Sequence, residues 1–299
     1  MYFTMKVLIV TNAYVLNSSQ KSQAQRIGEE LTVLGAEVEI KKNFDLARIE
    51  KGKISCKKYD LCVFLDKDKV AARMLERSGM RLFNSAQAIE VCDDKMLTHI
   101  SLSDSGINMP DCIYAPLCYN NSQQPDGHFL SEVEKFLAFP LVGKSNYGSL
   151  GAGVELIENR EQLFAYEKNN ILKPHFYQRF IDCGCGEDIR VIVVGGKYLC
   201  SMKRRNGNDF RSNIELGGKG ENYKADKEMI ALCEKVAAVL NLDYCGIDIL
   251  IDKNSKRYVC EVNSNAFFAA AERVCGVNVA RSYARYIVEN YKNSKKIVV

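Results

Sequence analysis

The distribution of hydrophobic positions at the start of the chain predicts a small open α/β unit. An apolar run over residues 5–11 has the length of a buried strand, and residues 22–42 continue as an amphipathic helix followed by a second strand. Residues 59–66 form another apolar strand, and a helix and a short strand follow over residues 69–84. Strands that alternate with helices are typical of an open α/β sheet, so we expect residues 1–90 to form a separate domain.

The remaining pattern predicts two further α+β units. Residues 85–103 have the periodicity of one helix. Predicted strands at 139–145 and 153–157 flank a glycine-rich loop, and a strand at 175–181 is expected to begin the last unit. The other elements expected there are a hairpin over 187–205 that turns at Gly195 and Gly196, a helix over 227–242, strands over 245–251 and 257–262, and a final helix over 278–293. The predicted domains are therefore residues 1–90, 91–176 and 177–299.

Composition narrows the function classes. The 299 residues are 47% hydrophobic, which is enough for a sizeable core, and 41 Lys and Arg against 37 Asp and Glu leave a net charge of +4. Because this charge is small and scattered, we expect no direct nucleic-acid binding. The N-terminal apolar run is too short for a membrane span or for a signal-peptide core, so we expect a cytoplasmic protein with no membrane segment.

The thiols and imidazoles do not suggest a metal centre. Twelve cysteines are spread along the chain without a C-x-x-C pair, which favours reduced and mostly buried thiols over disulfides. Cys183 and Cys185 are the one close pair, and the sequence gives them little support as a metal or redox site. The three histidines lie far apart, which gives equally little support to a zinc site.

The glycine-rich loop KSNYGSLGAGVEL, at residues 144–156, is the first candidate site. Gly148, Gly151 and Gly153 are followed by a predicted strand, whereas a dinucleotide-binding turn leads into a helix. Glycines nevertheless let backbone N–H groups approach phosphate oxygens, and Lys144 would add a mobile positive charge. Taken alone, the loop is equally consistent with a tight exposed hairpin.

The segment CGIDILIDKNSKRYVCEVN, at residues 245–263, places two carboxylates opposite each other if its strands form a hairpin centred between Asn254 and Ser255. Asp248 then pairs with Glu261, with Cβ atoms roughly 4.5–5.5 Å apart, and Asn263 lies on the same face as Glu261. Three oxygen-bearing side chains on one face suit a hard cation such as magnesium. A solvated acidic face is the alternative, but the flanking apolar residues favour a central sheet.

A third cluster, SMKRRNGNDFRSN at residues 201–213, contains Arg204, Arg205 and Arg211. Guanidinium groups present fixed forks of donors to carboxylates or phosphates. A basic surface loop explains this cluster equally well when it is taken alone.

In this order along the chain, the three features resemble the ATP-grasp superfamily and, more narrowly, the RimK-like carboxylate–amine ligases. The resemblance covers roughly residues 85–290 and depends on seven ordered segments: DDKMLTHISLSDSGINMP, FPLVGKSNYGSLGAGVEL, YQRFI, EDIRVIVVGG, DFRSN, GIDIL and EVNSN. It implies an ATP-grasp fold, in which a small open α/β domain precedes two α+β subdomains that enclose ATP. It also implies a ligase in which a substrate carboxylate and ATP form an acyl phosphate, and an amine then displaces phosphate.

The resemblance also implies roles for individual residues. Those expected at the phosphates and in the lid over them are Lys95, Lys144, Gly148, Ser149, Gly151 and Gly153. Those expected around adenine and ribose are Gln178, Arg179, Phe180, Ile181 and Asp188, with backbone groups of Arg179 and Phe180 reading the ring. Those expected beside the triphosphate and the reacting carboxylate are Arg204, Arg211, Ser212 and Asn213. The metal ligands would be Asp248, Glu261 and Asn263, holding two magnesium ions or, alternatively, manganese.

Departures from the family fall mainly on the substrate side. The segment NIELGG lacks a histidine found in the glutamate-adding relative, and EVNSNAFFAAAE replaces its Ser-Pro-Gly turn. Arg179 stands where relatives often carry an acidic residue, so adenine recognition would depend on backbone groups. The acceptor can therefore be an amino acid, a peptide or a protein, and homo-oligomerisation is left open.

Two other functions compete with the ligase. A regulatory module of the same fold would bind nucleotide without turnover, and a phosphotransferase would stop at a phosphorylated product. The intact set of Asp248, Glu261, Asn263 and Arg211 favours the ligase over the regulatory module. A dehydrogenase is disfavoured by the order of the glycines and by the strand that follows them.

Overall fold

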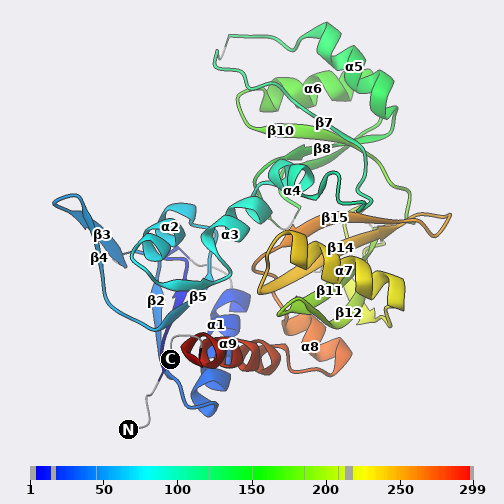
Figure 1. The fold of residues 1–299 in the computed structure, drawn as a ribbon. Helices are drawn as coiled ribbons and strands as arrows, with labels where there is room; N and C mark the ends of the chain where they lie inside the picture. Colours follow the sequence, from blue (N-terminus) through cyan, green and yellow to red (C-terminus); the bar gives the residue numbers. More distant parts are fainter. Residues whose placement is uncertain are drawn as a thin grey trace.

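Three β-sheets of four or five strands follow one another along the chain in the computed structural model (Figure 1). The structure describes residues 5–14, 18–44, 46–120, 122–149, 151–184, 186–207, 209–212 and 218–296. Within these ranges no helix is both long enough and apolar enough to cross a membrane. The cysteines in the same ranges are all free thiols.

The N-terminal unit is a parallel sheet, as the hydrophobic pattern predicts. Its strand order is β2-β1-β5-β6, from β1 (Lys6–Thr11), β2 (Glu37–Lys42), β5 (Leu61–Leu65) and β6 (Arg81–Phe83). The crossovers are α1 (Ser18–Val33) and α2 (Lys69–Arg77). A hairpin of β3 (Ala47–Glu50) and β4 (Lys53–Cys56), which the pattern does not predict, projects from this unit (Figure 1).

The single helix expected over residues 85–103 is wrong, because the structure has two helices there. They are α3 (Ala86–Asp93) and α4 (Lys95–Leu102), and Asp94 between them has extended backbone angles. The Asp94 carboxylate accepts hydrogen bonds from the N–H groups of Met96 and Leu97 at 2.9 and 3.2 Å. An aspartate that caps a helix in this way satisfies donors at the new N-terminus and ends the preceding helix. As a result, Lys95 occupies the first position of α4.

The central sheet has the order β7-β10-β8-β9. Its strands are β7 (Cys112–Tyr114), β8 (Leu141–Ser145), β9 (Val154–Ile157) and β10 (His175–Arg179), and the helices packed on it are α5 (Gly127–Leu137) and α6 (Arg160–Asn170). The sequence pattern does not identify β7 or α6. The expectation that residues 175–181 begin the last unit is also wrong, since β10 pairs with β7 and β8. The boundary expected after residue 176 therefore falls inside a strand of the central sheet.

The C-terminal sheet is antiparallel, with the order β13-β12-β11-β14-β15. Its strands are β11 (Glu187–Val194), β12 (Lys197–Arg205), β13 (Lys219–Asn222), β14 (Tyr244–Ile251) and β15 (Arg257–Asn263). The predicted turn at Gly195 and Gly196 is confirmed, and both glycines have positive φ. The remaining helices are α7 (Lys227–Val239), α8 (Ala269–Cys275) and α9 (Val279–Lys296).

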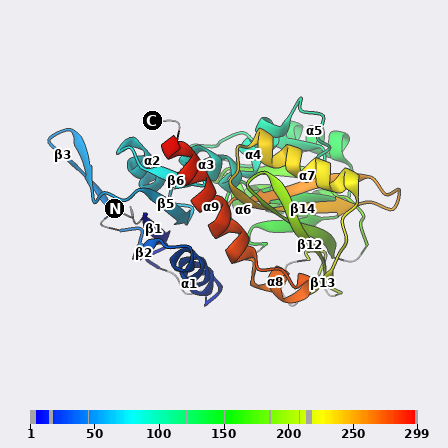
Figure 2. The ribbon, with the colours of Figure 1, turned by 60° about the horizontal axis from the view of Figure 1, so that its bottom comes forward.

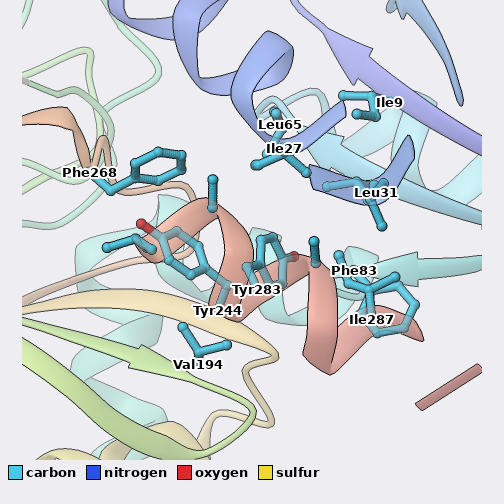
Figure 3. Packing of buried hydrophobic residues seen from close by; sticks show 14 of the residues in the cluster. Ile9, Ile27, Leu31, Leu65, Phe83, Val194, Tyr244, Phe268, Tyr283 and Ile287 are labelled. Carbon is cyan, nitrogen blue, oxygen red and sulfur yellow. The ribbon is translucent and has the colours of Figure 1, made fainter. Parts of the chain in front are cut away.

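The two faces of the C-terminal sheet pack against different helices, because successive residues of a strand point to opposite sides. Ile189 and Ile247 share a core with α7. Ile192, Val194 and Tyr244 belong to another core that contains α8, α9 and the first helix of the chain. Figure 2 shows α9 running between the N-terminal unit and the C-terminal sheet, and Figure 3 shows Tyr244 packed beside Tyr283 of α9, with ring centroids 5.0 Å apart. The C-terminal end of the chain thus fixes the N-terminal unit to this sheet.

Candidate active site

One cavity between the central and C-terminal sheets collects most of the residues singled out in the sequence. It encloses about 890 Å³, a volume that includes the open solvent at its mouth. The expected residues that line it are Lys95, Lys144, Gly148, Ser149, Gly151, Gln178, Arg179, Phe180, Ile181, Asp188, Arg204, Arg211, Ser212, Asp248 and Glu261. Gly153 and Asn263 are described but do not line it, and Asn213 and Cys185 lie outside the described residues.

The glycine-rich loop joins β8 to β9 over this cavity, which confirms the predicted order of strand, loop and strand. The N–H of Ser145 donates to the carbonyl of Gly153 at 2.9 Å and closes the base of the loop. Gly148, Gly151 and Gly153 have φ values of 134°, 78° and 70°, a region that favours glycine. A Cβ at Gly153 would lie only 2.9 Å from the Ser145 Cβ. The glycines therefore allow a close turn that other residues would strain.

Two lysines converge beneath the loop from different elements. The Lys95 ammonium donates to the carbonyl of Gly148 at 3.1 Å and lies 3.8 Å from a carboxylate oxygen of Glu261. Lys144, in β8, is only 8% exposed, and its Nζ lies 3.6 Å from Cys260 Sγ. Burial lowers the pKa of Lys95, and the Glu261 carboxylate offsets part of this shift. Buried ammonium groups in this position would stabilise an anionic ligand.

The acidic hairpin has the predicted pairing but a different turn. Asp248 lies directly opposite Glu261, as expected, and Asn263 lies opposite Gly246. Nearer the turn, Ile251 pairs with Arg257, so the hairpin is not centred between Asn254 and Ser255 along its whole length. The register shifts by one residue beside Asp248, where the second strand contains a bulge. The bulge restores the opposition of the two carboxylates.

Asp248 belongs to a chain of buried charges. Arg190 faces Asp248 across the paired strands β11 and β14, and its Nη2 donates to Oδ2 at 2.7 Å. Arg204 Nη2 lies 2.9 Å from the same oxygen, and its Nε donates to Asp188 at 2.7 Å. All four side chains are at least nine-tenths buried. Burial alone would raise the pKa of Asp248, but the two guanidinium groups outweigh it and hold that pKa below its usual value.

Sequence reasoning missed Arg190, although a signal is present. It is the one basic residue in the otherwise apolar stretch of β11 over residues 189–194, at a position that pairs with a carboxylate. A lone charge in a buried strand needs a partner nearby. Asp248 is far from Arg190 in the sequence, so this partner can be identified only when the pairing of β11 with β14 is known.

The expected adenine segment spans the end of β10 and the two residues after it, and all four of its residues line the cavity. The Gln178 amide lies 3.0 Å from His99 Nε2, which fixes the side chain beneath the segment. The Arg179 side chain donates to Asp111 at 2.9 Å, and to the carbonyl of Phe136 at 2.9 Å, so it is held against the end of α5. The Arg179 N–H donates to the carbonyl of Asp111 at 2.8 Å. This N–H therefore already has a partner within the protein.

Arg211 and Ser212 approach the cavity from the opposite side. Arg211 Nη1 donates to the carbonyl of Gly151 at 3.0 Å, and its Nη2 donates to Asp209 at 2.6 Å. Ser212 is buried and lines the cavity together with Asp188. The arginine thus bridges the two subdomains at the outer edge of the loop.

The donor set on the hairpin fits a divalent cation. An ionised carboxylate has about four lone-pair sites, so Asp248 can accept hydrogen bonds from arginine and still bind a cation. The Glu261 side chain is 28% exposed and lies beside the Lys95 ammonium at the cavity wall. Within the described ranges, no three His, Cys, Asp or Glu side chains are arranged to hold a metal ion. Coordination would therefore be completed by Asn263 or by the oxygens of a bound phosphate.

Comparison with known protein families agrees with this geometry. The model of the RimK-like ATP-grasp domain matches residues 92–287. Protein MG012 of Mycoplasma genitalium is 30% identical over 92% of this chain and 97% of its own length. Human N-acetylaspartylglutamate synthase A is 31% identical over 76% of this chain and 57% of its own length. Glutamate–LysW ligase ArgX of Sulfurisphaera tokodaii is 31% identical over 74% of this chain and 77% of its own length.

Solved structures share the fold over almost the whole chain. The D-alanine–D-alanine ligase of Bacillus anthracis has a TM-score of 0.75 at 19% identity, covering 99% of this chain and 100% of that one. A RimK domain ATP-grasp protein of Sphaerobacter thermophilus has a TM-score of 0.72 at 18% identity, covering 94% and 98%. At these identities the likeness concerns the fold, and the small N-terminal α/β unit is part of it.

Proposed function

We propose that this chain, which belongs to the RimK-like ATP-grasp family and is an ATP-dependent carboxylate–amine ligase, acts on an amino acid or peptide. In this proposal the carboxylate substrate is activated as an acyl phosphate before the amine substrate reacts with it. The observation that carries the proposal is the arrangement around one cavity of the buried Lys144 and the partly buried Lys95, a glycine-rich loop and an opposed Asp–Glu pair. Each group suits a different part of a nucleoside triphosphate with its metal.

In this proposal the nucleotide lies along the cavity. Backbone groups of Phe180 and Ile181 contact adenine, since the Arg179 N–H is already bonded. Lys95 and Lys144 neutralise the phosphates, and the loop that contains Gly148 covers them. Because Asp188 is already paired with Arg204, its main role is to hold that arginine, with only its remaining acceptor capacity left for ribose.

The reaction proceeds in two displacements. A substrate carboxylate oxygen bonds to the γ-phosphorus while the bond to ADP breaks, and an amine nitrogen then bonds to the acyl carbon while inorganic phosphate leaves and the amine loses a proton. Arg204 and Arg211 offer donors where negative charge develops on the phosphoryl group and on the tetrahedral carbon. Magnesium held by Asp248 and Glu261, with Asn263 completing the set, would supply charge neutralisation between the phosphates.

Two finer proposals concern the identity of the metal ion and the cellular compartment. Manganese can replace magnesium, because both accept carboxylate and phosphate oxygens. The free thiols of the described cysteines support a reducing compartment, and we propose the cytoplasm. A solved PsnB ligase of the same fold was determined with magnesium and ADP, at 16% identity and a TM-score of 0.68, which supports the choice of magnesium.

The relatives suggest which amine to test first. Glutamate occurs in the names of N-acetylaspartylglutamate synthase A, glutamate–LysW ligase ArgX and beta-citrylglutamate synthase B, the last being 32% identical over 74% of this chain and 56% of its own length in humans. We therefore propose glutamate as the first amine, paired in turn with different carboxylic acids and with peptides.

The test is a pairwise screen for ADP release in the presence of magnesium, with each pair repeated without the amine. We expect one or more pairs to release ADP and to form an amide in equal amounts, and we expect the Glu261→Ala protein to do neither. ADP release that is unchanged without an amine would indicate a phosphotransferase. Nucleotide binding without turnover by any pair would indicate a regulatory module.

A further inference from the structure

A lysine of the N-terminal unit contacts the glycine-rich loop of the central unit. Lys69, the first residue of α2, places its ammonium 4.4 Å from the centre of the Tyr147 ring. This tyrosine lies near the start of the loop, one residue before Gly148. An ammonium over an aromatic face is attracted by the ring quadrupole. The N-terminal unit therefore contacts the segment that would cover the phosphates.

Neighbouring charges hold both partners of this contact. The Asp93 carboxylate lies 3.7 Å from the Lys69 ammonium and 3.2 Å from that of Lys67. The next residue, Asp94, accepts a hydrogen bond from Asn146 at 3.1 Å. Burial and the nearby Asp94 carboxylate raise the pKa of the Tyr147 hydroxyl. The same aspartate caps α4, the helix that begins with Lys95. The start of the loop is thus attached to α2 and to the beginning of α4 together.

Two further contacts of the loop use groups that a nucleotide would require. Lys95 donates to the carbonyl of Gly148, and Arg211 donates to the carbonyl of Gly151. Both cations line the cavity and are proposed to meet phosphate oxygens. A charged phosphate oxygen is a stronger acceptor than a backbone carbonyl, so bound ATP would draw them from the loop. The contact of Lys69 with Tyr147 does not compete with the nucleotide in this way.

We infer that Lys69 is a positioning residue, which through Tyr147 holds the glycine-rich loop over the phosphates when nucleotide is bound. The inference rests on the proposed function and adds a role for the N-terminal unit in binding the nucleotide. Lys69 touches neither substrate nor nucleotide. Its effect passes through one aromatic side chain, so it should depend on the presence of that ring and on a positive charge above it.

The chain contains no tryptophan, which makes a direct test available. Tyr147→Trp introduces a single indole that keeps the aromatic face beneath Lys69 and reports on the loop by fluorescence. In this background we expect Lys69→Met to weaken binding of ADP with magnesium about two- to five-fold, and to make the introduced indole more accessible to acrylamide quenching. Lys69→Arg should restore both values, because a guanidinium also stacks on an aromatic ring.

A matched control comes from a second lysine of the same unit. Lys57 lies 5.2 Å over the Tyr59 ring, outside the cavity lining, so Lys57→Met should leave ADP affinity and quenching of the introduced indole unchanged. A double-mutant cycle with Tyr147→Leu, measured by calorimetry in the chain with native tyrosine, should show non-additive effects of positions 69 and 147 on ADP affinity.

The outcomes separate this inference from the proposed function. Normal ADP affinity in Lys69→Met, additive effects in the cycle, or failure of Lys69→Arg to restore affinity would each overturn the inference while leaving the ligase proposal intact. A parental protein that binds no nucleotide would contradict both.

Discussion

The C-terminal sheet meets its two neighbours in opposite ways. Toward the N-terminal unit the junction is filled, because Val194 and Tyr244 of the sheet pack in one continuous core with Ile27 of α1 and Tyr283 of α9 (Figure 3). Toward the central unit the junction is hollow, and charged side chains line the space. The central sheet has a separate core of its own.

Both junctions use the same face of the same sheet. Along β11, Asp188 lines the cavity and Arg190 bonds to Asp248 of the cavity wall, while Ile192 and Val194 further along belong to the apolar core. The period of two residues places all four on one side. A change from charged to apolar residues along one strand therefore divides the face into a binding region and a packing region.

Ion pairs around the filled junction support this division. Arg26 donates to Glu272 at 2.7 Å, and Arg81 donates to Asp243 at 2.8 Å, across the boundary between the N-terminal and C-terminal units. At the hollow junction the cations instead hold carbonyls of the loop, or carboxylates expected to bind metal. Substitutions at the filled junction should therefore change the free energy of unfolding, and substitutions at the hollow junction should change nucleotide binding or turnover.

The largest effect is expected from Glu261→Ala at the hollow junction. Loss of one proposed metal ligand should lower kcat by at least about 100-fold, because charge on the transferring phosphoryl group loses its neutralisation. The thermal unfolding midpoint should change little, since the side chain is partly exposed and Ala fits the strand. Near-normal turnover would contradict the metal assignment.

At the filled junction, Ile27→Ala should destabilise the fold by about 2–5 kcal/mol, because it leaves a cavity among fully buried side chains. Chemical denaturation measures this loss. Ile49→Ala is the matched control, as the same change at a side chain that is 67% exposed should cost much less. Equal destabilisation by the two variants would show that the junction is not filled as described.

Acid should destabilise the fold through His99, beneath the adenine segment. Burial, with a contribution from the Lys144 charge, lowers the pKa of His99 to about 4, against an unperturbed value of about 6.5. Between these values the unfolded chain binds more protons, so the free energy of unfolding falls as pH decreases, by at most ~3 kcal/mol from this group. His99→Gln should flatten the pH dependence across that window. If the free energy of unfolding changed with pH equally in the parent and in His99→Gln, His99 would not be the source of the acid sensitivity.

The smallest expected effect is on nucleotide affinity. Lys144→Ala removes a buried ammonium from the proposed phosphate site and should weaken ADP binding at least about tenfold, as measured by calorimetry. Lys135→Ala, at a side chain that is 79% exposed on α5, should leave the affinity unchanged. An unchanged affinity in the Lys144 variant would remove this residue from the phosphate site.

Local patterns in the sequence predicted much of the fold and of the cavity lining. The order of strand, loop and strand around Gly148, the turn at Gly195 and the pairing of Asp248 with Glu261 all follow from alternation and turn residues that are close in sequence. The break at Asp94 was missed because one capping side chain overrides an otherwise continuous helical pattern.

The remaining errors concern partners that are distant in sequence. The alternation in residues 175–181 predicts a strand but does not say which sheet it joins. Arg190 could be recognised as unusual, but its pairing with Asp248 requires knowing that β11 and β14 are neighbours. The bulge beside Asp248 depends on both strands of the hairpin, so counting residues from a symmetric turn gave the correct pair with an incorrect turn.

Transfer of oxygen-18 from the substrate carboxylate to phosphate tests the central claim most directly. With a carboxylate substrate fully labelled at both oxygens, an acyl phosphate intermediate places one labelled oxygen in each molecule of inorganic phosphate released, and mass spectrometry counts it. We predict one labelled oxygen per phosphate, and no labelled phosphate from the Glu261→Ala protein. Amide formation with unlabelled phosphate would contradict the account.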